Sequence, residues 1–317
     1  MNERSDTGRV VAEHPRRLRP GDTVAVVAPC GPVDPERLER GTGVLRGLGL
    51  DVIVGSGVLG RQGFLAGPDS ARAADLQAAW CDPQVSAVIC ARGGYGATRL
   101  FGALDWDAMR AAGPKILLGS SDVTALHRAF AAELGVATLF GPMPACSLLG
   151  VPEGPEPETL ARLRAALFAG ERPEPVHGDR VLLQGRAEGP LGGGNLSLLA
   201  ALCGTPYGFR ANGHIVLLED VGEVPYRIDR MLTQLLQAGV LDGAAGFALG
   251  SWTRCGDPDE VLDVVAGRLA PLGVPIVAGL PIGHGSPQFS VWMEADGVID
   301  TQSCSLTGLF RDPERAP

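Results

Sequence analysis

The segment from Lys115 to Asp122 joins an apolar strand pattern to a polar turn, and a helix pattern begins directly after it. A serine on such a turn is held at the end of a sheet with its hydroxyl exposed and the first helical amides close by. Those amides could bind the oxyanion of a tetrahedral intermediate. The alternative is that Ser120, Ser121 and Asp122 only cap the helix. The turn also departs from GxSxG, since Val123 replaces the second glycine.

A serine nucleophile needs a base, usually histidine, and a carboxylate that orients this base. Elimination among the five histidines leaves His284, which follows a strand pattern and is flanked by glycines that could hold an imidazole in an open site. The alternative is a turn histidine without a catalytic role. Glu219 and Asp220 end the apolar strand HIVLLED, where an ionised group is costly unless it has a role. Neighbouring strand side chains face opposite sides, so only one of the two could serve. Glu223 is a third candidate.

Two further segments are rich in glycine, and the first of them follows a strand pattern. The first, residues 91–96 (ARGGYG), could present a backbone N–H to an oxyanion, and Arg92 or Arg99 could pair with a peptide carboxylate. A surface turn and a phosphate cradle are the alternatives, although neither GxxxxGKS/T nor GxGxxG occurs at this turn. The second, residues 191–197 (LGGGNLS), could form a wall of the site or a close-packed turn.

The first half of the chain predicts the scaffold that would position these residues. Expected strands at 22–30, 51–56, 85–91 and 115–120 alternate with expected helices at 35–49, 69–82 and 122–135. Apolar strands separated by amphipathic helices indicate a parallel sheet that is covered on both faces. Sites in such sheets form at the carboxyl ends of the strands. This rule selects residues 28–31, 92–96 and 119–122.

The second half of the chain differs from the first in composition and in its pattern of strands and helices. Residues 151–185 are rich in Pro and Glu around one short helix pattern, which is typical of a connection between domains. Later segments predict strands at 214–221, 246–252 and 274–281 and a helix at 226–239. We therefore predict an N-terminal parallel α/β domain over residues 1–150, a connection over 151–185, and a smaller C-terminal α+β domain over 186–317 that carries Glu and His.

Composition excludes several classes of protein. The net charge of −9 argues against nucleic-acid binding, and we expect the short cluster Arg16, Arg17 and Arg19 to be a solvated lead-in. No apolar run approaches the ~20 residues of a membrane helix, so no membrane partner is expected. The seven cysteines include no CxxC pair and predict buried free thiols in a cytoplasmic protein. There is no HExxH, Cys/His cluster or calcium loop, so neither a metal nor another cofactor is expected.

Six motifs, in order along residues 20–310, resemble the LD-carboxypeptidase family of serine peptidases. They are GDTVAVVAPCGPV, ARGGYGATRL, GSSDVTALH, GGGNLSLL with CGTPY after it, LLEDVGEVPYRIDRML, and LPIGHG. This family includes muropeptide-recycling enzymes and microcin C immunity peptidases. The resemblance implies an N-terminal parallel-sheet domain of flavodoxin or glutamine-amidotransferase type that supplies a serine, and a second domain that supplies Glu and His.

The resemblance also implies roles for particular residues. Ser121, the serine before Asp in GSSD, would be the nucleophile, with His284 as base and Glu219 as the orienting carboxylate. The backbone N–H groups of Asp122 and Gly94 would form the oxyanion hole. The residues expected to contact substrate are Arg92, Tyr95, Arg99 and Asn195. Ser120 is small where the family more often has an aromatic residue, which should alter packing more than chemistry.

The expected reaction is hydrolysis of an L,D-peptide bond that releases terminal D-alanine from murein tetrapeptides during cell-wall recycling, by a homodimer without a cofactor. One alternative is a microcin C-type immunity peptidase or amidase that cleaves peptidyl- or aminoacyl-nucleotides; residues 150–190 contain no Trp or Tyr to stack a base, and one Phe168. A second alternative is a non-catalytic muropeptide-binding protein. A glutamine amidotransferase would need cysteine at the turn.

Overall fold

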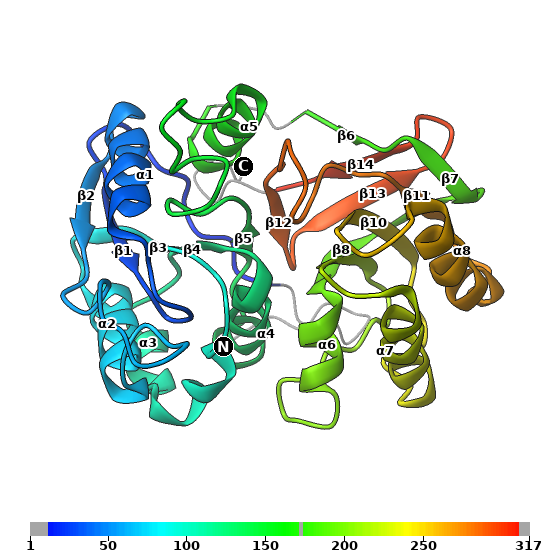
Figure 1. Ribbon diagram of the computed structural model, residues 1–317, viewed down its shortest axis with the longest axis horizontal. Helices are drawn as coiled ribbons and strands as arrows, with labels where there is room; N and C mark the ends of the chain where they lie inside the picture. The colour runs from blue at the N-terminus through cyan, green and yellow to red at the C-terminus, as the bar shows by residue number, and fades with distance from the viewer. Residues whose placement is uncertain (1–11, 171–173, 311–317) are drawn as a thin grey trace.

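Two β-sheets lie side by side, each with helices packed on it (Figure 1). The structure, a computed structural model, describes residues 12–170 and 174–310. The start of the lead-in (1–11), three residues of the expected connection (171–173) and residues 311–317 lie outside the described part. Within that part, no helix has both the length and the apolar composition to cross a bilayer.

The first sheet confirms the predicted parallel architecture. Its strand order is β12-β5-β4-β3-β1-β2, and the five strands from the N-terminal half run parallel. Those strands are β1 (Thr23–Val27), β2 (Asp51–Val54), β3 (Val85–Cys90), β4 (Ile116–Gly119) and β5 (Thr138–Phe140). Strand β5 has no recognisable strand pattern in the sequence, because it is only three residues long.

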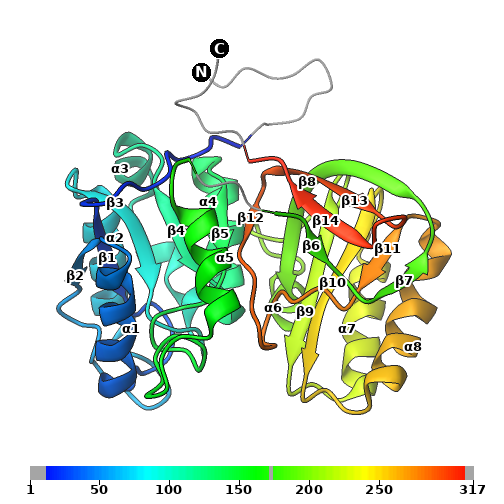
Figure 2. The ribbon, with the colours of Figure 1, turned by 90° about the horizontal axis from the view of Figure 1, so that it is seen from above.

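Helices cover both faces of this sheet (Figures 1 and 2). One face packs against α1 (Pro35–Gly47) and α5 (Pro157–Leu167), and the other against α2 (Asp69–Cys81), α3 (Trp106–Ala111) and α4 (Thr124–Leu134). Asp34 caps α1 by accepting from the Arg37 amide at 2.9 Å, and Pro35 begins that helix without needing an N–H donor. Because both faces are covered, β3 and β4 are apolar along their whole length.

Each sheet forms a lobe together with the helices that pack on it. Two segments of the first lobe, which contains the six-stranded sheet, come from outside residues 1–150. Helix α5 lies in the expected connection, yet its Leu163 and Leu167 belong to the first core. Strand β12 (Val291–Met293) comes from the C-terminal half and pairs antiparallel with β5 at the sheet edge. The lobes are therefore joined by the connection and also by β12, a strand from the C-terminal half that belongs to the first sheet. A contiguous division of the chain could not have shown this.

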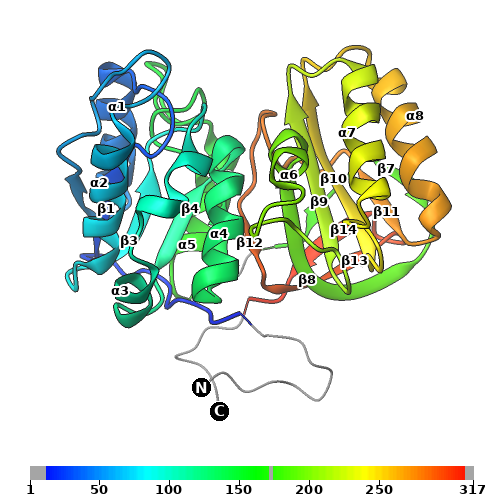
Figure 3. The ribbon, with the colours of Figure 1, turned by 90° about the horizontal axis from the view of Figure 1, so that it is seen from below.

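The second sheet is mixed and has the order β6-β14-β13-β8-β9-β10-β11-β7. Strands β8 (Arg186–Asn195), β9 (Ile215–Val221), β10 (Gly246–Thr253) and β11 (Ile276–Ala278) are parallel, and α6 (Leu196–Leu202), α7 (Pro225–Gln237) and α8 (Pro258–Leu269) cover one face (Figure 3). The remaining strands are β6 (Val176–His177), β7 (Arg180–Leu183), β13 (Asp296–Asp300) and β14 (Ser305–Gly308). The predicted second domain is confirmed as a sheet domain, with parallel connections at its centre.

The LGGGNLS segment is not a turn, because residues 191–195 end strand β8 and the last two residues begin helix α6. A Cβ at Gly193 would lie 2.3 Å from the Leu217 carbonyl oxygen, so only glycine lets β8 approach β9 at this register. Glycine is rare inside strands, so the three consecutive glycines at 192–194 do not predict a strand.

The lead-in is also docked onto the fold. Arg16 forms an ion pair with Asp22, and the buried Arg17 donates to the Ala165 carbonyl oxygen at 2.8 Å. The expectation of a solvated tail was therefore wrong for these residues. All seven cysteines are free thiols, and Cys30, Cys90 and Cys255 are buried.

Candidate active site

Ser121 occupies the turn between β4 and α4. A single 3₁₀ turn, Ser121–Val123, links the two elements, and the φ angle of Ser121 is 62°. This left-handed conformation is unusual for a residue with a side chain and costs free energy, so it marks a turn whose shape matters. Ser121 is half-buried, whereas Ser120 is buried in an extended conformation.

The capping alternative does not hold at this turn. Neither Ser120 nor Val123, the residues that precede the 3₁₀ turn and α4, makes a side-chain capping bond. The Asp122 carboxylate instead accepts from the backbone N–H of Ala97 at 2.9 Å. Burial raises the pKa of this carboxyl group, against the lowering effect of the Ala97 amide. Asp122 therefore fastens the glycine-rich loop to the serine turn.

The glycine-rich loop lies directly against Ser121. A Cβ at Gly93 would lie 2.8 Å from Ser121 Cβ and 3.1 Å from its Oγ. The Gly93 carbonyl accepts from the Gly31 amide at 3.1 Å, so the ends of β1, β3 and β4 meet as predicted. Among the described residues, the Gly94 amide has no acceptor, and the Asp122 amide has none outside its own helical turn. Both remain available to a ligand.

His284 pairs with Glu219 in the second lobe. The two residues are 65 positions apart in the chain, yet His284 Nδ1 lies 2.6 Å from Glu219 Oε2. Glu219 is 0% exposed and also accepts from Asn195 Nδ2 at 3.2 Å. Asp220 has no contact with His284 and instead accepts from the amide and the hydroxyl of Ser197. The structure thus selects Glu219 among the three carboxylates considered.

The carboxylate sets the electrostatics of the imidazole. Burial lowers the pKa of His284, but the hydrogen bond and negative charge of Glu219 outweigh burial, so the pKa is raised above its usual value. His127, by contrast, is a structural histidine. It is buried between Thr138 Oγ1 and the Gly119 carbonyl oxygen, and burial lowers its pKa to about 4.

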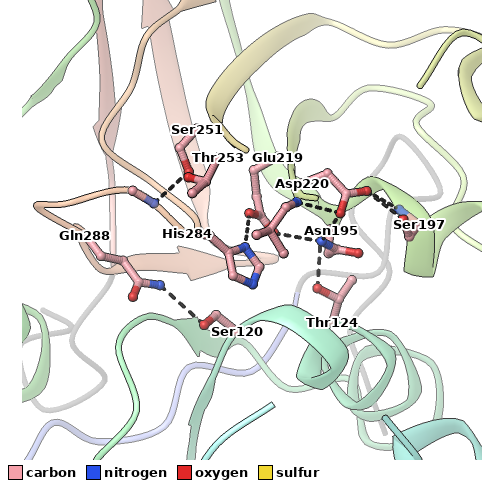
Figure 4. Close-up of polar contacts among 12 residues, drawn as sticks. Ser120, Thr124, Asn195, Ser197, Glu219, Asp220, Ser251, Thr253, His284 and Gln288 are labelled. Atoms are coloured by element: carbon pink, nitrogen blue, oxygen red, sulfur yellow. Dashed lines mark hydrogen bonds and ion pairs between the residues drawn. The ribbon is translucent and has the colours of Figure 1, made fainter. Parts of the chain in front are cut away.

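Contacts between the lobes bring the serine turn to the histidine. At one end of the turn, Ser120 Oγ accepts from Gln288 Nε2 at 3.3 Å, and at the other end Thr124 Oγ1 accepts from the Asn195 amide at 3.1 Å. Figure 4 shows the second ring nitrogen of His284 directed away from Glu219 and toward the turn bounded by Ser120 and Thr124. Nothing in the local sequence around Thr124 or Gln288 signals these bridging contacts.

The residues expected to bind substrate lie in different environments. Asn195 is buried, and its Nδ2 donates to Glu219 and to Asp220. Arg99 forms an ion pair with Asp69, and Arg92 donates to the Pro32 carbonyl oxygen. Tyr95 is 51% exposed and meets the Phe64 ring edge-on, beside a surface hollow of about 470 Å³.

No group of three or more His, Cys, Asp or Glu side chains in residues 12–170 and 174–310 could hold a metal ion. A serine turn in one lobe faces a carboxylate-bound histidine in the other. Such an arrangement is typical of hydrolytic enzymes that use a serine nucleophile.

Comparison with known proteins identifies the family. Residues 24–141 match the LD-carboxypeptidase N-terminal domain, and residues 188–299 match the LD-carboxypeptidase C-terminal domain. The chain belongs to the LD-carboxypeptidase family and is a peptidase. The two matched ranges fall within the two lobes and contain Ser121, Glu219 and His284.

Related proteins align with most or nearly all of the chain. A carboxypeptidase-like protein of Streptomyces coelicolor is 50% identical over 298 residues, covering 92% of this chain and 95% of that protein. The murein tetrapeptide carboxypeptidase of Pseudomonas aeruginosa is 37% identical over 275 residues, covering 83% and 88%. The microcin C7 self-immunity protein, solved in complex with aspartyl sulfamoyl adenosine, shares the fold with a TM-score of 0.84 at 21% identity, covering 94% of this chain and 98% of that one.

Proposed function

We propose that this protein is a serine carboxypeptidase that hydrolyses an L,D-peptide bond and releases terminal D-alanine from murein tetrapeptides during cell-wall recycling. The observation that carries the proposal is the 2.6 Å contact between His284 and Glu219 beside a serine in a left-handed strand–helix turn. The murein tetrapeptide carboxypeptidase of P. aeruginosa, 37% identical, supports the class of substrate.

In the first half of the reaction, Ser121 Oγ attacks the carbonyl carbon of the amide that joins an L-centre to D-alanine. His284 Nε2 takes the hydroxyl proton, while Glu219 holds Nδ1 and stabilises the charged ring. The carbonyl oxygen becomes an oxyanion, to which the amides of Asp122 and Gly94 donate. His284 then returns the proton to the nitrogen, the C–N bond breaks, and D-alanine leaves.

In the second half, water attacks the acyl-enzyme. His284 takes a proton from this water, the second tetrahedral intermediate collapses, and the proton returns to Ser121 Oγ. The products are a tripeptide and D-alanine, and the enzyme is regenerated. No cofactor enters either step.

The test is mass spectrometry of a murein tetrapeptide incubated with the protein, where loss of one alanine is expected. Ser121→Ala should lower kcat by on the order of 10⁴-fold or more, as for other serine triads. Ser120→Ala is the comparison variant: it removes the neighbouring hydroxyl, which accepts from Gln288 between the lobes, and should lower kcat far less than Ser121→Ala. Full activity of Ser121→Ala would refute the mechanism.

Two further measurements separate this function from its alternatives. A fluorophosphonate probe should label Ser121, and absence of labelling in the folded protein would favour a non-catalytic muropeptide-binding protein. An aminoacyl sulfamoyl nucleotide offered in parallel should be cleaved slowly or not at all. Preference for that substrate over the tetrapeptide would assign the chain to the immunity type of peptidase.

A further inference from the structure

A carboxypeptidase must recognise the free carboxylate at the end of its substrate, and an arginine suits this role because its planar guanidinium can bind a carboxylate through two parallel hydrogen bonds. The two arginines near the serine turn already have partners. Arg99 donates to both oxygens of Asp69, and Arg92 donates to the backbone carbonyl oxygens of Pro32 and Gly93. The cation for the carboxylate must therefore be sought elsewhere.

The chemistry of the leaving group restricts where this cation can lie. In a terminal D-alanine, one carbon atom separates the carboxylate from the amide nitrogen. His284 protonates that nitrogen in the proposed mechanism, so the group that binds the carboxylate must lie beside the imidazole. Asp69, the partner of Arg99, begins helix α2 of the first lobe, whereas His284 belongs to the second lobe.

Arg254 satisfies the positional requirement. It directly follows strand β10, whose Trp252 and Thr253 pair with Asp220 and Val221 at the end of β9. The next residue after His284, Gly285, donates its amide to Ser251 Oγ at 2.9 Å, which fastens the histidine loop to the same strand end (Figure 4). Arg254 thus emerges from the sheet edge that holds Glu219 and the histidine loop.

Arg254 is also unusual in its conformation and surroundings. Its φ angle is 56°, in the left-handed region that costs a non-glycine residue free energy. Its side chain is exposed and has no hydrogen bond or ion pair with any of the described residues. Neither nearby carboxylate forms an ion pair with Arg254, because Glu223 pairs with Arg227 and Asp220 accepts from Asn195 and Ser197.

The charge of Arg254 reaches the catalytic imidazole. After burial and the opposing influence of Glu219 and Asp220, Arg254 is a further influence on the pKa of His284, which its positive charge lowers. An arginine that acts on this ring through space, yet has no partner, is available to a bound anion next to the leaving group.

We propose that Arg254 binds the terminal carboxylate of the peptide substrate and so makes the site select for chain ends; this inference rests on the proposed carboxypeptidase function. The guanidinium would hold the leaving D-alanine with its nitrogen beside His284. A substrate whose last carboxylate is converted to an amide would lose this interaction, and so would an endopeptide.

The experiment compares the tetrapeptide with its C-terminal carboxamide, using wild type, Arg254→Gln and Arg254→Lys. Wild type should prefer the free acid. Arg254→Gln should raise the KM for the acid by ~10- to 100-fold, the range expected for loss of a hydrogen bond to a charged group, and leave kcat/KM for the amide within a few fold. Arg254→Lys should recover part of the preference, because it restores the charge but not the planar fork.

The matched control is Arg210→Gln, which removes an exposed arginine of the same lobe that lies near the opposite end of β9. It should leave the preference for the acid unchanged. Fluorophosphonate labelling of Ser121 at the wild-type rate in Arg254→Gln would show that the nucleophile and base are intact. Calorimetric binding of the tetrapeptide to Ser121→Ala, with and without Arg254→Gln, measures the same contact without turnover.

Different results would contradict the role of Arg254 and the proposed carboxypeptidase activity. If wild type releases alanine but Arg254→Gln keeps its KM and affinity for the acid, or loses acid and amide activity equally, Arg254 does not bind the carboxylate. If the preference is lost in Arg99→Gln instead, the cation is Arg99. If wild type cleaves neither substrate, the proposed function fails and the assignment of Arg254 fails with it.

Discussion

At the scale of single residues, the site depends on how one carboxylate acts on one imidazole. Glu219 is completely buried, and its contacts with His284 and Asn195 leave it little freedom to turn. A buried carboxylate that holds Nδ1 fixes the tautomer in which Nε2 can accept a proton. The same charge raises the pKa of the ring, against burial, which lowers it.

Glu219→Gln should therefore change both the rate and its pH dependence. The base must be neutral to accept the serine proton, so wild-type kcat/KM should rise with pH through a value above the usual histidine pKa of about 6.5. Removing the negative charge should move this limb to lower pH and reduce the plateau by on the order of 10³- to 10⁴-fold. The pH profile of alanine release measures both effects, and an unmoved limb would contradict the assignment.

The protonation of His284 should also affect the stability of the fold, and the direction of this effect follows from its raised pKa. A histidine whose pKa is raised on folding stabilises the native state fully below its unfolded pKa of about 6.5, and this contribution is lost as pH rises through the folded pKa. Thermal unfolding of wild type and Glu219→Gln between pH 5.5 and 8.5 should therefore show the larger difference at the acidic end.

At the scale of elements, the glycine-rich loop and the serine turn are built to fit each other. The loop is fastened from three sides: Ala97 to Asp122, Gly93 to Gly31, and Gly96 to Arg72, whose Nη1 donates to the Gly96 carbonyl at 3.1 Å. A fastened loop can hold oxyanion donors in place without reorganising during the reaction. The absence of a side chain at Gly93 lets the loop reach Ser121.

Gly93→Ala should test this fit. The added Cβ would lie 2.8 Å from Ser121 Cβ, so the turn or the loop must shift. Displacing a catalytic group by about 1 Å can cost on the order of 10²-fold in rate, and we expect a loss of this size in kcat. The rate of alanine release measures kcat, and the rate of fluorophosphonate labelling measures the reactivity of Ser121.

The control for this variant is Gly43→Ala on helix α1, where an added Cβ would meet no atom within 4 Å. Alanine is a better helix former, so this change should stabilise the fold by about 0.5–1 kcal/mol and leave activity unchanged. Equal activity of Gly93→Ala and wild type would show that the loop tolerates the methyl group.

At the scale of the whole molecule, the lobes are held together by polar contacts away from the site as well as at it. Glu294 lies between β12 and β13, where it accepts from Arg128 of helix α4 and lies 3.2 Å from His214 Nε2 of the second lobe. The side chains of Arg128 and Glu294 are only 13% and 15% exposed. Breaking such a pair leaves one charge buried without its partner.

Glu294→Gln should destabilise the fold by about 3 kcal/mol, the lower end of the range for breaking a buried ion pair, since some solvent reaches it. Burial raises the pKa of Glu294, but Arg128 and His214 outweigh burial and hold it below its usual value. Its contribution is thus present above the unfolded pKa and lost as pH falls through the folded pKa. Urea unfolding at pH 7 and pH 4 should show a smaller difference between variant and wild type at pH 4.

The control is Glu188→Gln, which breaks the pair of Arg186 and Glu188, whose side chains are 56% and 59% exposed. An exposed pair of this kind contributes about 0–1 kcal/mol, so the change should be small. A comparable effect of the two variants would show that the contact between Arg128 and Glu294 does not hold the lobes together.

The sequence by itself determined strands β1–β4 and β9–β11, helices α1, α2, α4, α5 and α7, the serine turn, and the edge of the first sheet at which the glycine loop meets it. It did not predict the other strands and helices of the two lobes. The predicted features are local: strand and helix patterns, and the rule that parallel strands end at one edge, need no knowledge of distant contacts. Motif resemblance added the family and the expected roles of Ser121, Glu219 and His284. Short β5 and the glycine-filled β8 were missed because local propensity is weak where three residues or bare backbone form a strand.

Only the tertiary structure decided what lies next to what. The pairing of Glu219 rather than Asp220 or Glu223 with His284, the burial of Asn195, the place of β12 in the first sheet and the unpaired Arg254 all depend on contacts between segments far apart in the chain. Such contacts follow from how two sheets pack and twist against each other, which is a property of the whole set of buried side chains. No short stretch of residues contains that information.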